Sequence, residues 1–108
     1  MEKLIVDTSS ILAGFHFDGT TKYYISPLAA DEIRRGKKKE DLDGLVEREV
    51  LIIQAPTLQT MDKVTVGAQE SGDINRLSRA DIEILALALE ISAEVITDDF
   101  GNTYQRVP

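Results

Sequence analysis

LSRADIEILALALEISAEVITDD, residues 77–99, joins the strongest helix pattern in the chain to a short strand pattern. The middle of this stretch is apolar almost all round a helix, which predicts a buried helix that begins at Ser78. Ser78 also stands three residues before Asp81, which is the spacing of a capping box. Residues 94–97 (EVIT) predict a short strand, and Asp98-Asp99 begins the loop after that strand.

Strand-like and helix-like patterns alternate in the rest of the chain. Residues 3–7 (KLIVD) and 50–54 (VLIIQ) predict buried strands, and residues 23–26 predict a brief extended piece. The other apolar periodicities predict four helices: one capped by Thr8 or Ser9 and running through Ile11, Leu12 and Phe15, one from Ser26-Pro27 to Arg35, one over 40–49, and one from Pro56-Thr57 to Glu70 that Gly72 ends. This alternation predicts an α/β fold, in which a small parallel sheet carries helices on both faces.

Length and composition are those of one globular domain, residues 1–108. The chain is 43% hydrophobic and 29% charged, and it shows no long apolar run or basic-then-apolar leader, so we expect a soluble cytoplasmic protein that does not bind membranes. It contains no Cys, and His16 is its only histidine. These counts exclude a thiol nucleophile and a Ser-His-acid relay, so carboxylates and a bound metal must perform any chemistry.

Acidic residues occupy the predicted ends of several strands and helices. Asp7 and the Asp98-Asp99 pair follow strands, while Glu32 and Asp81 lie near the N-termini of helices. Because ligands of open parallel sheets bind outside the carboxyl ends of the strands, we expect these four segments to converge at one edge. Carboxylate oxygens suit a hard cation, so the pattern predicts a Mg²⁺ or Mn²⁺ site.

Each acid also has an ordinary structural explanation. Asp7 can bond the backbone of a turn, Glu32 can be an exposed helical residue, and Asp81 can belong to the capping box. Asp98-Asp99 can be a turn. The functional interpretation therefore depends on the joint placement of the four segments rather than on any single acid.

The net charge of −7 opposes the binding of a polyanion through overall charge, so any such contact must be local. A basic cluster around Gly36 offers that contact, and it consists of Arg34, Arg35, Lys37, Lys38 and Lys39. The same cations also complement the negative C-terminus of a helix. A solvated helix end and a phosphate-contacting patch are therefore both compatible with this cluster.

In their order and spacing these motifs resemble those of the PIN-domain ribonucleases. The motifs are Asp7-Thr8-Ser9 after a buried strand, Pro27-x4-Glu32-Ile33, Leu77-Ser78-x2-Asp81 opening an apolar helix, and Thr97-x-Asp99 after a strand. The resemblance covers nearly the whole chain. Within the family, the stretch from Gly72-Asp73 to TDDF looks most like the endonuclease that matures the 3′ end of small-subunit ribosomal RNA.

The resemblance implies a Mg²⁺- or Mn²⁺-dependent endoribonuclease that hydrolyses single-stranded RNA. Its partner would be pre-ribosomal RNA or the small ribosomal subunit. The oligomeric state is left open, and a homo-oligomer is compatible with the sequence. Asp7, Glu32, Asp81 and Asp99 would be the catalytic metal ligands, Asp98 a neighbouring ligand, and Ser9 and Ser78 supporting residues. The basic cluster would contact RNA.

Two departures from the family limit this transfer. Only nine residues follow Asp99, where the family usually adds a helix and a strand, so residues 101–108 predict one brief extended piece at most and a truncated C-terminus. The ribosomal-RNA enzymes usually also carry a zinc ribbon, and a chain without Cys lacks its usual ligands. A toxin-type PIN ribonuclease and a non-catalytic PIN-like module that binds RNA or protein therefore remain alternatives.

Overall fold

The computed structural model describes residues 2–97 and 105–107, the last three by their backbone alone. Its single sheet has the strand order β3-β2-β1-β4-β5. The neighbouring strands β3, β2, β1 and β4 run parallel, and β5 pairs antiparallel with β4. The strands are β1 (Lys3–Val6), β2 (Lys22–Ile25), β3 (Leu51–Ile53), β4 (Glu94–Thr97) and β5 (Gln105–Val107).

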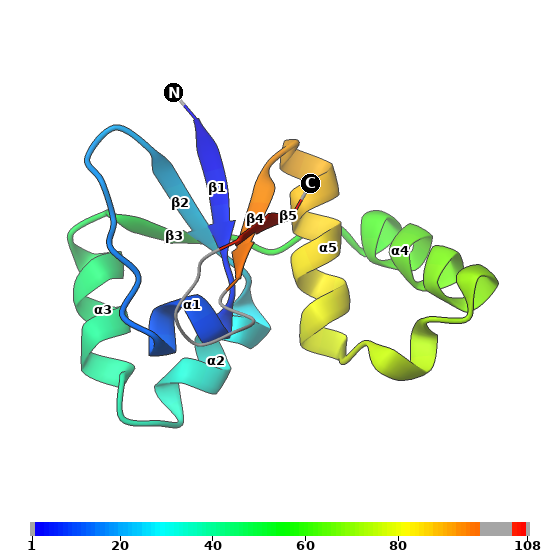
Figure 1. Ribbon diagram of the computed structural model, residues 1–108, viewed down its shortest axis with the longest axis horizontal. Helices are drawn as coiled ribbons and strands as arrows, with labels where there is room; N and C mark the ends of the chain where they lie inside the picture. The colour runs from blue at the N-terminus through cyan, green and yellow to red at the C-terminus, as the bar shows by residue number, and fades with distance from the viewer. Residues whose placement is uncertain (1, 98–104, 108) are drawn as a thin grey trace.

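Five α-helices connect the parallel strands (Figure 1). They are α1 (Thr8–Leu12), α2 (Pro27–Arg34), α3 (Lys39–Glu47), α4 (Leu58–Ser71) and α5 (Arg79–Ile91), with a short 3₁₀ helix, η1 (Ile74–Arg76), before α5. The chain crosses the sheet in one direction through α1, α2 and α3, and it returns past β1 through α4 and α5. None of the helices in residues 2–97 is both long and apolar enough to cross a bilayer.

The hydrophobic core surrounds β1, which is the middle strand. Leu4, Ile5 and Val6 are consecutive and all buried, although neighbouring side chains of a strand point to opposite faces. Both faces of the sheet are therefore covered by helices, as the sequence predicts. Ile33 of α2 and Leu87 of α5 are among the helical side chains that complete this core.

The structure corrects two of the predicted boundaries. The piece expected at residues 23–26 is a full strand, β2, which pairs with both β1 and β3. The first helix ends at Leu12 rather than reaching Phe15, because Gly14 takes a left-handed conformation with φ +81°. Phe15 instead packs in the loop against Tyr23, with the ring centroids 5.6 Å apart.

The prediction that α5 is buried all round is wrong on one side. Ile82, Ile84 and Leu87 are buried, but Leu85 is 36% exposed and Leu89 is 61% exposed. The sheet, α2 and α4 all contact α5. Leu85 and Leu89 line a hollow beside Val64 of α4, which sits next to α5 in Figure 1, and this hollow leaves both leucines partly in solvent.

This difference between two leucines of one helix gives a stability test. Leu87→Ala should lower the free energy of unfolding by about 2–5 kcal/mol, because it removes a fully buried side chain and leaves a cavity. Leu89→Ala should cost less than about 1 kcal/mol, because that side chain is mostly in water already. Urea unfolding of both variants gives the two values, and equal costs would contradict the described packing of α5.

The N-terminus of α4 is attached to α5 by Glu90. One oxygen of this carboxylate, Oε1, accepts hydrogen bonds from Thr57 Oγ1 at 2.7 Å, from Thr60 Oγ1 at 2.9 Å and from Thr57 N at 3.0 Å. The bonds from the Thr57 side chain and backbone, followed by that from Thr60, lower the pKa of Glu90. These bonds favour the ionised carboxylate in the folded state.

The lowered pKa predicts a pH-dependent contribution to stability. A carboxyl whose pKa falls on folding stabilises the protein above its unfolded pKa, and the effect is lost as the pH falls through the folded pKa. Glu90→Gln should therefore lower the melting temperature at pH 7, and this deficit should shrink as the pH falls below the ordinary pKa of a glutamate. Thermal melts across a pH series provide the measurement, and a deficit that does not shrink at any acidic pH would assign the effect to something other than charge.

Candidate functional site

Asp7 lies at the carboxyl end of β1 and caps the N-terminus of α1. Its Oδ1 accepts hydrogen bonds from Ser10 N at 3.0 Å and from Ser9 Oγ at 2.7 Å. Asp7, rather than the expected Thr8 or Ser9, is therefore the N-cap. Within residues 2–97 no group donates a hydrogen bond to the other oxygen, Oδ2, and no cation pairs with this carboxylate.

The first turn of α1 is attached to the end of β4. Ser10 is fully buried, and its Oγ donates a hydrogen bond to Ile96 O at 2.8 Å. Ser9 Oγ lies 3.2 Å from Thr97 Oγ1, in addition to its bond to Asp7. These contacts place the end of β4 directly beside Asp7. Ser9 thus holds one oxygen of Asp7.

Asp81 and Asp7 line the same pocket, which has a volume of about 270 Å³. Asp81 is the third residue of α5, where its Oδ2 accepts a hydrogen bond from Ser78 N at 2.9 Å while Ser78 Oγ accepts one from Asp81 N at 3.0 Å. The capping box is thus present, and Ser78 supports Asp81 directly. Leu77, Ile84 and Thr97 are among the other residues that line the pocket.

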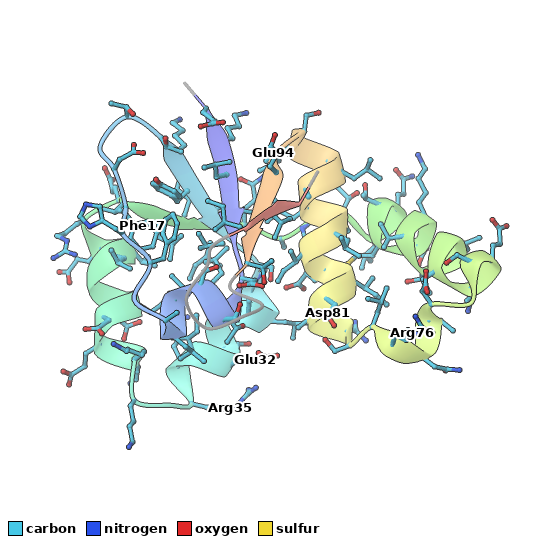
Figure 2. The ribbon with its side chains drawn as sticks, in the orientation of Figure 1. Phe17, Glu32, Arg35, Arg76, Asp81 and Glu94 are labelled. Atoms are coloured by element: carbon cyan, nitrogen blue, oxygen red, sulfur yellow. The ribbon has the colours of Figure 1, made fainter. Side chains whose placement is uncertain are left out.

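Glu32 reaches the neighbourhood of Asp7 through a threonine. Thr8 Oγ1 donates a hydrogen bond to Glu32 Oε2 at 3.0 Å, and Thr8 directly follows Asp7 in the chain. Figure 2 shows Glu32 and Asp81 toward the same end of the molecule, to which the carboxyl end of β1 points, while Glu94 lies toward the opposite end. Three of the four predicted segments therefore meet at one edge of the sheet.

The described acids do not form a closed cluster. In residues 2–97 and 105–107, no three Asp, Glu or His side chains lie close enough to hold one metal ion together. Asp98 and Asp99 fall outside the described residues, so the prediction that Asp7, Glu32, Asp81 and Asp99 share one cation stays a prediction.

The donor set nevertheless fits a hard divalent cation. Asp7, Glu32 and Asp81 each engage one carboxylate oxygen in a hydrogen bond to the protein, and in the described part of the chain nothing donates to the second oxygen. These groups offer only oxygen ligands, which Mg²⁺ and Mn²⁺ prefer.

The basic cluster occupies the turn from α2 to α3. Two of its members are paired with acids of α3: Arg34 Nε lies 3.0 Å from Asp43 Oδ1, and Lys38 Nζ lies 3.4 Å from Asp41 Oδ2. Arg35, Lys37 and Lys39 are exposed, and no ion pair to them is found in the described residues. Ion pairs with α3 therefore engage two of these five cations, and the other three have no such pair in the described residues.

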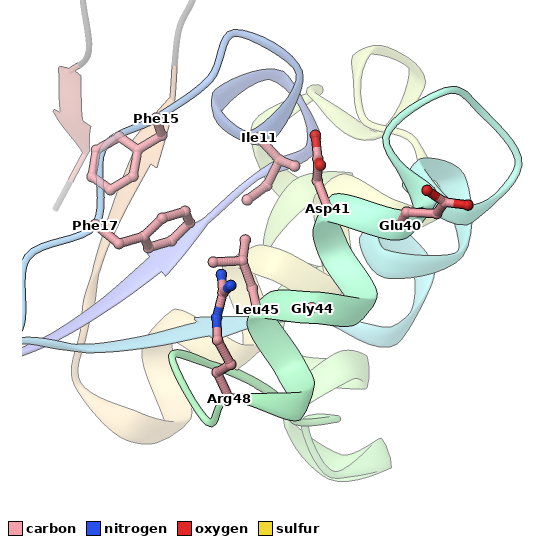
Figure 3. A pocket seen from close by; sticks show the side chains of 8 residues that line it. All are labelled: Ile11, Phe15, Phe17, Glu40, Asp41, Gly44, Leu45 and Arg48. Carbon is pink, nitrogen blue, oxygen red and sulfur yellow. The ribbon is translucent and has the colours of Figure 1, made fainter.

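A separate hollow of about 310 Å³ lies between α1, the loop after it and α3 (Figure 3). Phe15, Phe17 and Leu45 form apolar walls, and Arg48 stands at one rim. None of the predicted metal ligands lines this hollow, so it is distinct from the acidic pocket.

Sequence reasoning gave Thr8 only a capping role and Thr97 none, although both residues belong to the motifs. In the structure Thr8 holds Glu32, and Thr97 contacts Ser9 and lines the acidic pocket. Their position in the sequence could have indicated a role, because each of these threonines lies within two residues of a motif acid at the end of a strand.

Known proteins are similar in sequence to this chain over most of its length. A family model described as the PIN domain of ribonuclease matches residues 4–91. Endoribonuclease Nob1 of Pyrococcus abyssi is 33% identical over 99 residues, which cover 92% of this chain and 59% of that protein. Endoribonuclease Nob1 of Methanothermobacter thermautotrophicus is 31% identical over 102 residues, which cover 91% of this chain and 59% of that protein.

A ribonuclease of another name also occurs among these relatives. Ribonuclease VapC3 of Aeropyrum pernix is 30% identical over 111 residues, which cover 98% of this chain and 78% of that protein. The chain thus spans about 59% of the length of the two Nob1 relatives and more of VapC3. The matched family model, the identities and the predicted motif order agree, and the chain belongs to the PIN-domain family of ribonucleases.

Proposed function

We propose that this chain is a divalent-metal-dependent endoribonuclease that hydrolyses phosphodiester bonds in single-stranded RNA. The observation that carries the proposal is the pocket shared by Asp7 and Asp81, together with the tie between Glu32 and Thr8 beside it. Membership of a ribonuclease family supports the reaction class. The chain has no Cys, and its only histidine, His16, does not line this pocket, so carboxylates are the available chemical groups there.

The chain's own residues have separable tasks in this proposal. Asp7, Glu32 and Asp81, with Asp99 and its neighbour Asp98, would hold Mg²⁺ or Mn²⁺. Ser9 and Ser78 fix the two aspartates of the pocket so that one oxygen of each is bound and the other can face a ligand. A divalent ion at these oxygens would activate water as the nucleophile and neutralise charge on the attacked phosphate.

For the substrate, we propose pre-ribosomal RNA of the small subunit. The support is the likeness to the Nob1 endoribonucleases, which agrees with the sequence resemblance to the enzyme that matures the 3′ end of that RNA. The second candidate is a toxin-type ribonuclease, which the likeness to VapC3 and to VapC1 of Thermoplasma acidophilum favours. Copurification of a small protein that covers the acidic pocket would favour the toxin.

The dual role of the two aspartates allows catalysis to be separated from stability. Asn is about as good an N-cap as Asp, and the side-chain oxygen of Asn at position 81 can accept the same bond from Ser78 N. Asp7→Asn and Asp81→Asn should therefore leave the melting temperature nearly unchanged. Both variants lose a charge that would hold the cation, so metal-dependent cleavage of single-stranded RNA should fall by roughly a hundredfold or more. Cleavage rates in a Mn²⁺ series and thermal melts of the same samples provide the measurements.

Asp62→Asn is the matched control, because Asp62 is an exposed acid on α4 that does not line the pocket. It should cleave like the parent protein. Parent protein that binds RNA without metal-dependent cleavage would instead identify a non-catalytic module. If Asp81→Asn lost stability and kept its cleavage, Asp81 would have a capping role alone.

We expect the contact to the RNA backbone from the three members of the basic cluster that have no ion pair within the described ranges. Replacing Arg35, Lys37 and Lys39 with Gln should weaken RNA binding and flatten the slope of log affinity against log salt by about two units, at roughly 0.7 per phosphate contact. Metal binding should be spared. The measurement is RNA affinity across a salt series, with Lys63→Gln on α4 as control, and an unchanged slope would leave these cations as a solvated helix end.

A further inference from the structure

Glu83 joins the N-terminus of α2 to α5. This half-buried glutamate lies on α5, and its Oε1 accepts a hydrogen bond of 2.8 Å from Leu28 N in the first turn of α2. We infer that Glu83 is a positioning residue, which sets α2 against α5 and thereby sets Glu32 against Asp81. The inference rests on the proposed function, since it concerns the spacing of two proposed metal ligands.

The hydrogen bonding of the first turn of α2 depends on this carboxylate. Pro27 has no N–H group, Ala29 N donates to Ser26 Oγ at 3.4 Å, and Ala30 N donates to Ser26 O at 3.0 Å. The N–H of Leu28 is the remaining donor of that turn, and Glu83 accepts it. A carboxylate at this place also interacts favourably with the positive end of the helix dipole, so the bond is charge-assisted.

The two joined helices carry two different proposed ligands. Glu32 lies on α2, and Asp81 lies two residues before Glu83 on α5. The bond from Thr8 to Glu32 is exposed, whereas the bond from Leu28 to Glu83 is partly buried. Water competes less with a partly buried bond, so the bond to Glu83 is the firmer of these two hydrogen bonds. Both bonds add to the packing of α2 in the core, through Ala29, Ala30 and Ile33.

Glu90 provides a natural comparison on the same helix. It also accepts hydrogen bonds at a helix N-terminus, that of α4. Unlike α2, α4 carries none of the proposed metal ligands. Removal of Glu90 therefore reproduces the loss of a cap from a neighbouring helix without changing the spacing between Glu32 and Asp81.

The first test measures the spacing of the helices directly. The chain has no Cys, so Asp31→Cys on α2 and Arg79→Cys on α5 give two unique sites for nitroxide spin labels. Both positions are exposed and neither belongs to the proposed metal site. The distance distribution between the labels should be narrow in the parent and should broaden or shift in Glu83→Ala. It should stay narrow in Glu83→Gln, whose side-chain carbonyl can accept the same bond, and in Glu90→Ala.

The second test measures the metal site. Mn²⁺ binding, followed by the loss of the free-ion electron paramagnetic resonance signal, should weaken by about tenfold or more in Glu83→Ala, the scale typical of residues that orient metal ligands. Glu83→Gln should restore parent binding, and Glu90→Ala should keep it despite a lower melting temperature. Single-turnover cleavage of RNA by the same proteins should follow the same order.

Three outcomes would overturn the inference. They are an unchanged distance distribution in Glu83→Ala, unchanged Mn²⁺ binding in that variant, and a loss of binding in Glu83→Gln as large as in Glu83→Ala. The last would mean that Glu83 acts through its charge, as a metal ligand would. Parent protein that fails to cleave RNA with Mn²⁺ would reject the proposed function, whereas the label distances and Mn²⁺ binding would still decide the role of Glu83.

Discussion

The N–H groups in the first turn of a helix have no acceptor within that helix, and in this fold three carboxylates of α5 accept such groups. Asp81 closes the N-terminus of α5 itself, Glu83 accepts from α2, and Glu90 accepts from α4. Glu83 and Glu90 are seven residues apart, which places them on one face of the helix. The apolar side of α5 enters the core, so one helix connects the core to the starts of two others.

Capping of a helix N-terminus by a carboxylate also explains how one acidic residue can both stabilise the fold and be available to bind a metal. A carboxylate has two oxygens, and an N-cap uses one of them. Asp7 binds Ser9 and Ser10 through Oδ1, and Asp81 binds Ser78 through Oδ2, so each presents a second oxygen that nothing in residues 2–97 engages. The capping and metal-binding interpretations of these two residues are therefore compatible, since each assigns a different oxygen.

Local pattern determined what could be predicted from the sequence. The parallel sheet, the cap at Ser78 and the end of α4 at Gly72 follow from short-range signals, and the structure has all three. β2 was predicted only as a brief extended piece, although it is four residues long, like β1 and β4, and pairs on both sides. The exposed side of α5 could not be predicted, because a pattern of leucines gives the apolarity of a helix and not the number of its neighbours.

Contacts between distant segments could not be predicted either, because a local sequence pattern carries no information about them. The bond between Leu28 and Glu83 spans 55 positions, and no spacing rule links a backbone N–H to a side chain so far along the chain. The motif order predicted that Asp7, Glu32 and Asp81 approach one edge, but it did not reveal which residues hold them there. Thr8, Thr97 and Glu83 became visible only through their hydrogen bonds.

The short length of α2 links the two halves of the proposed function. Its eight residues span about 12 Å at 1.5 Å per residue, with the Glu83 contact at one end, Glu32 in the second turn and the basic turn at the other end. An RNA phosphate bound at Arg35 and a metal held by Glu32 would therefore contact one rigid element. Whatever fixes the N-terminus of α2 would then fix both proposed contacts together, within a chain whose net charge is −7.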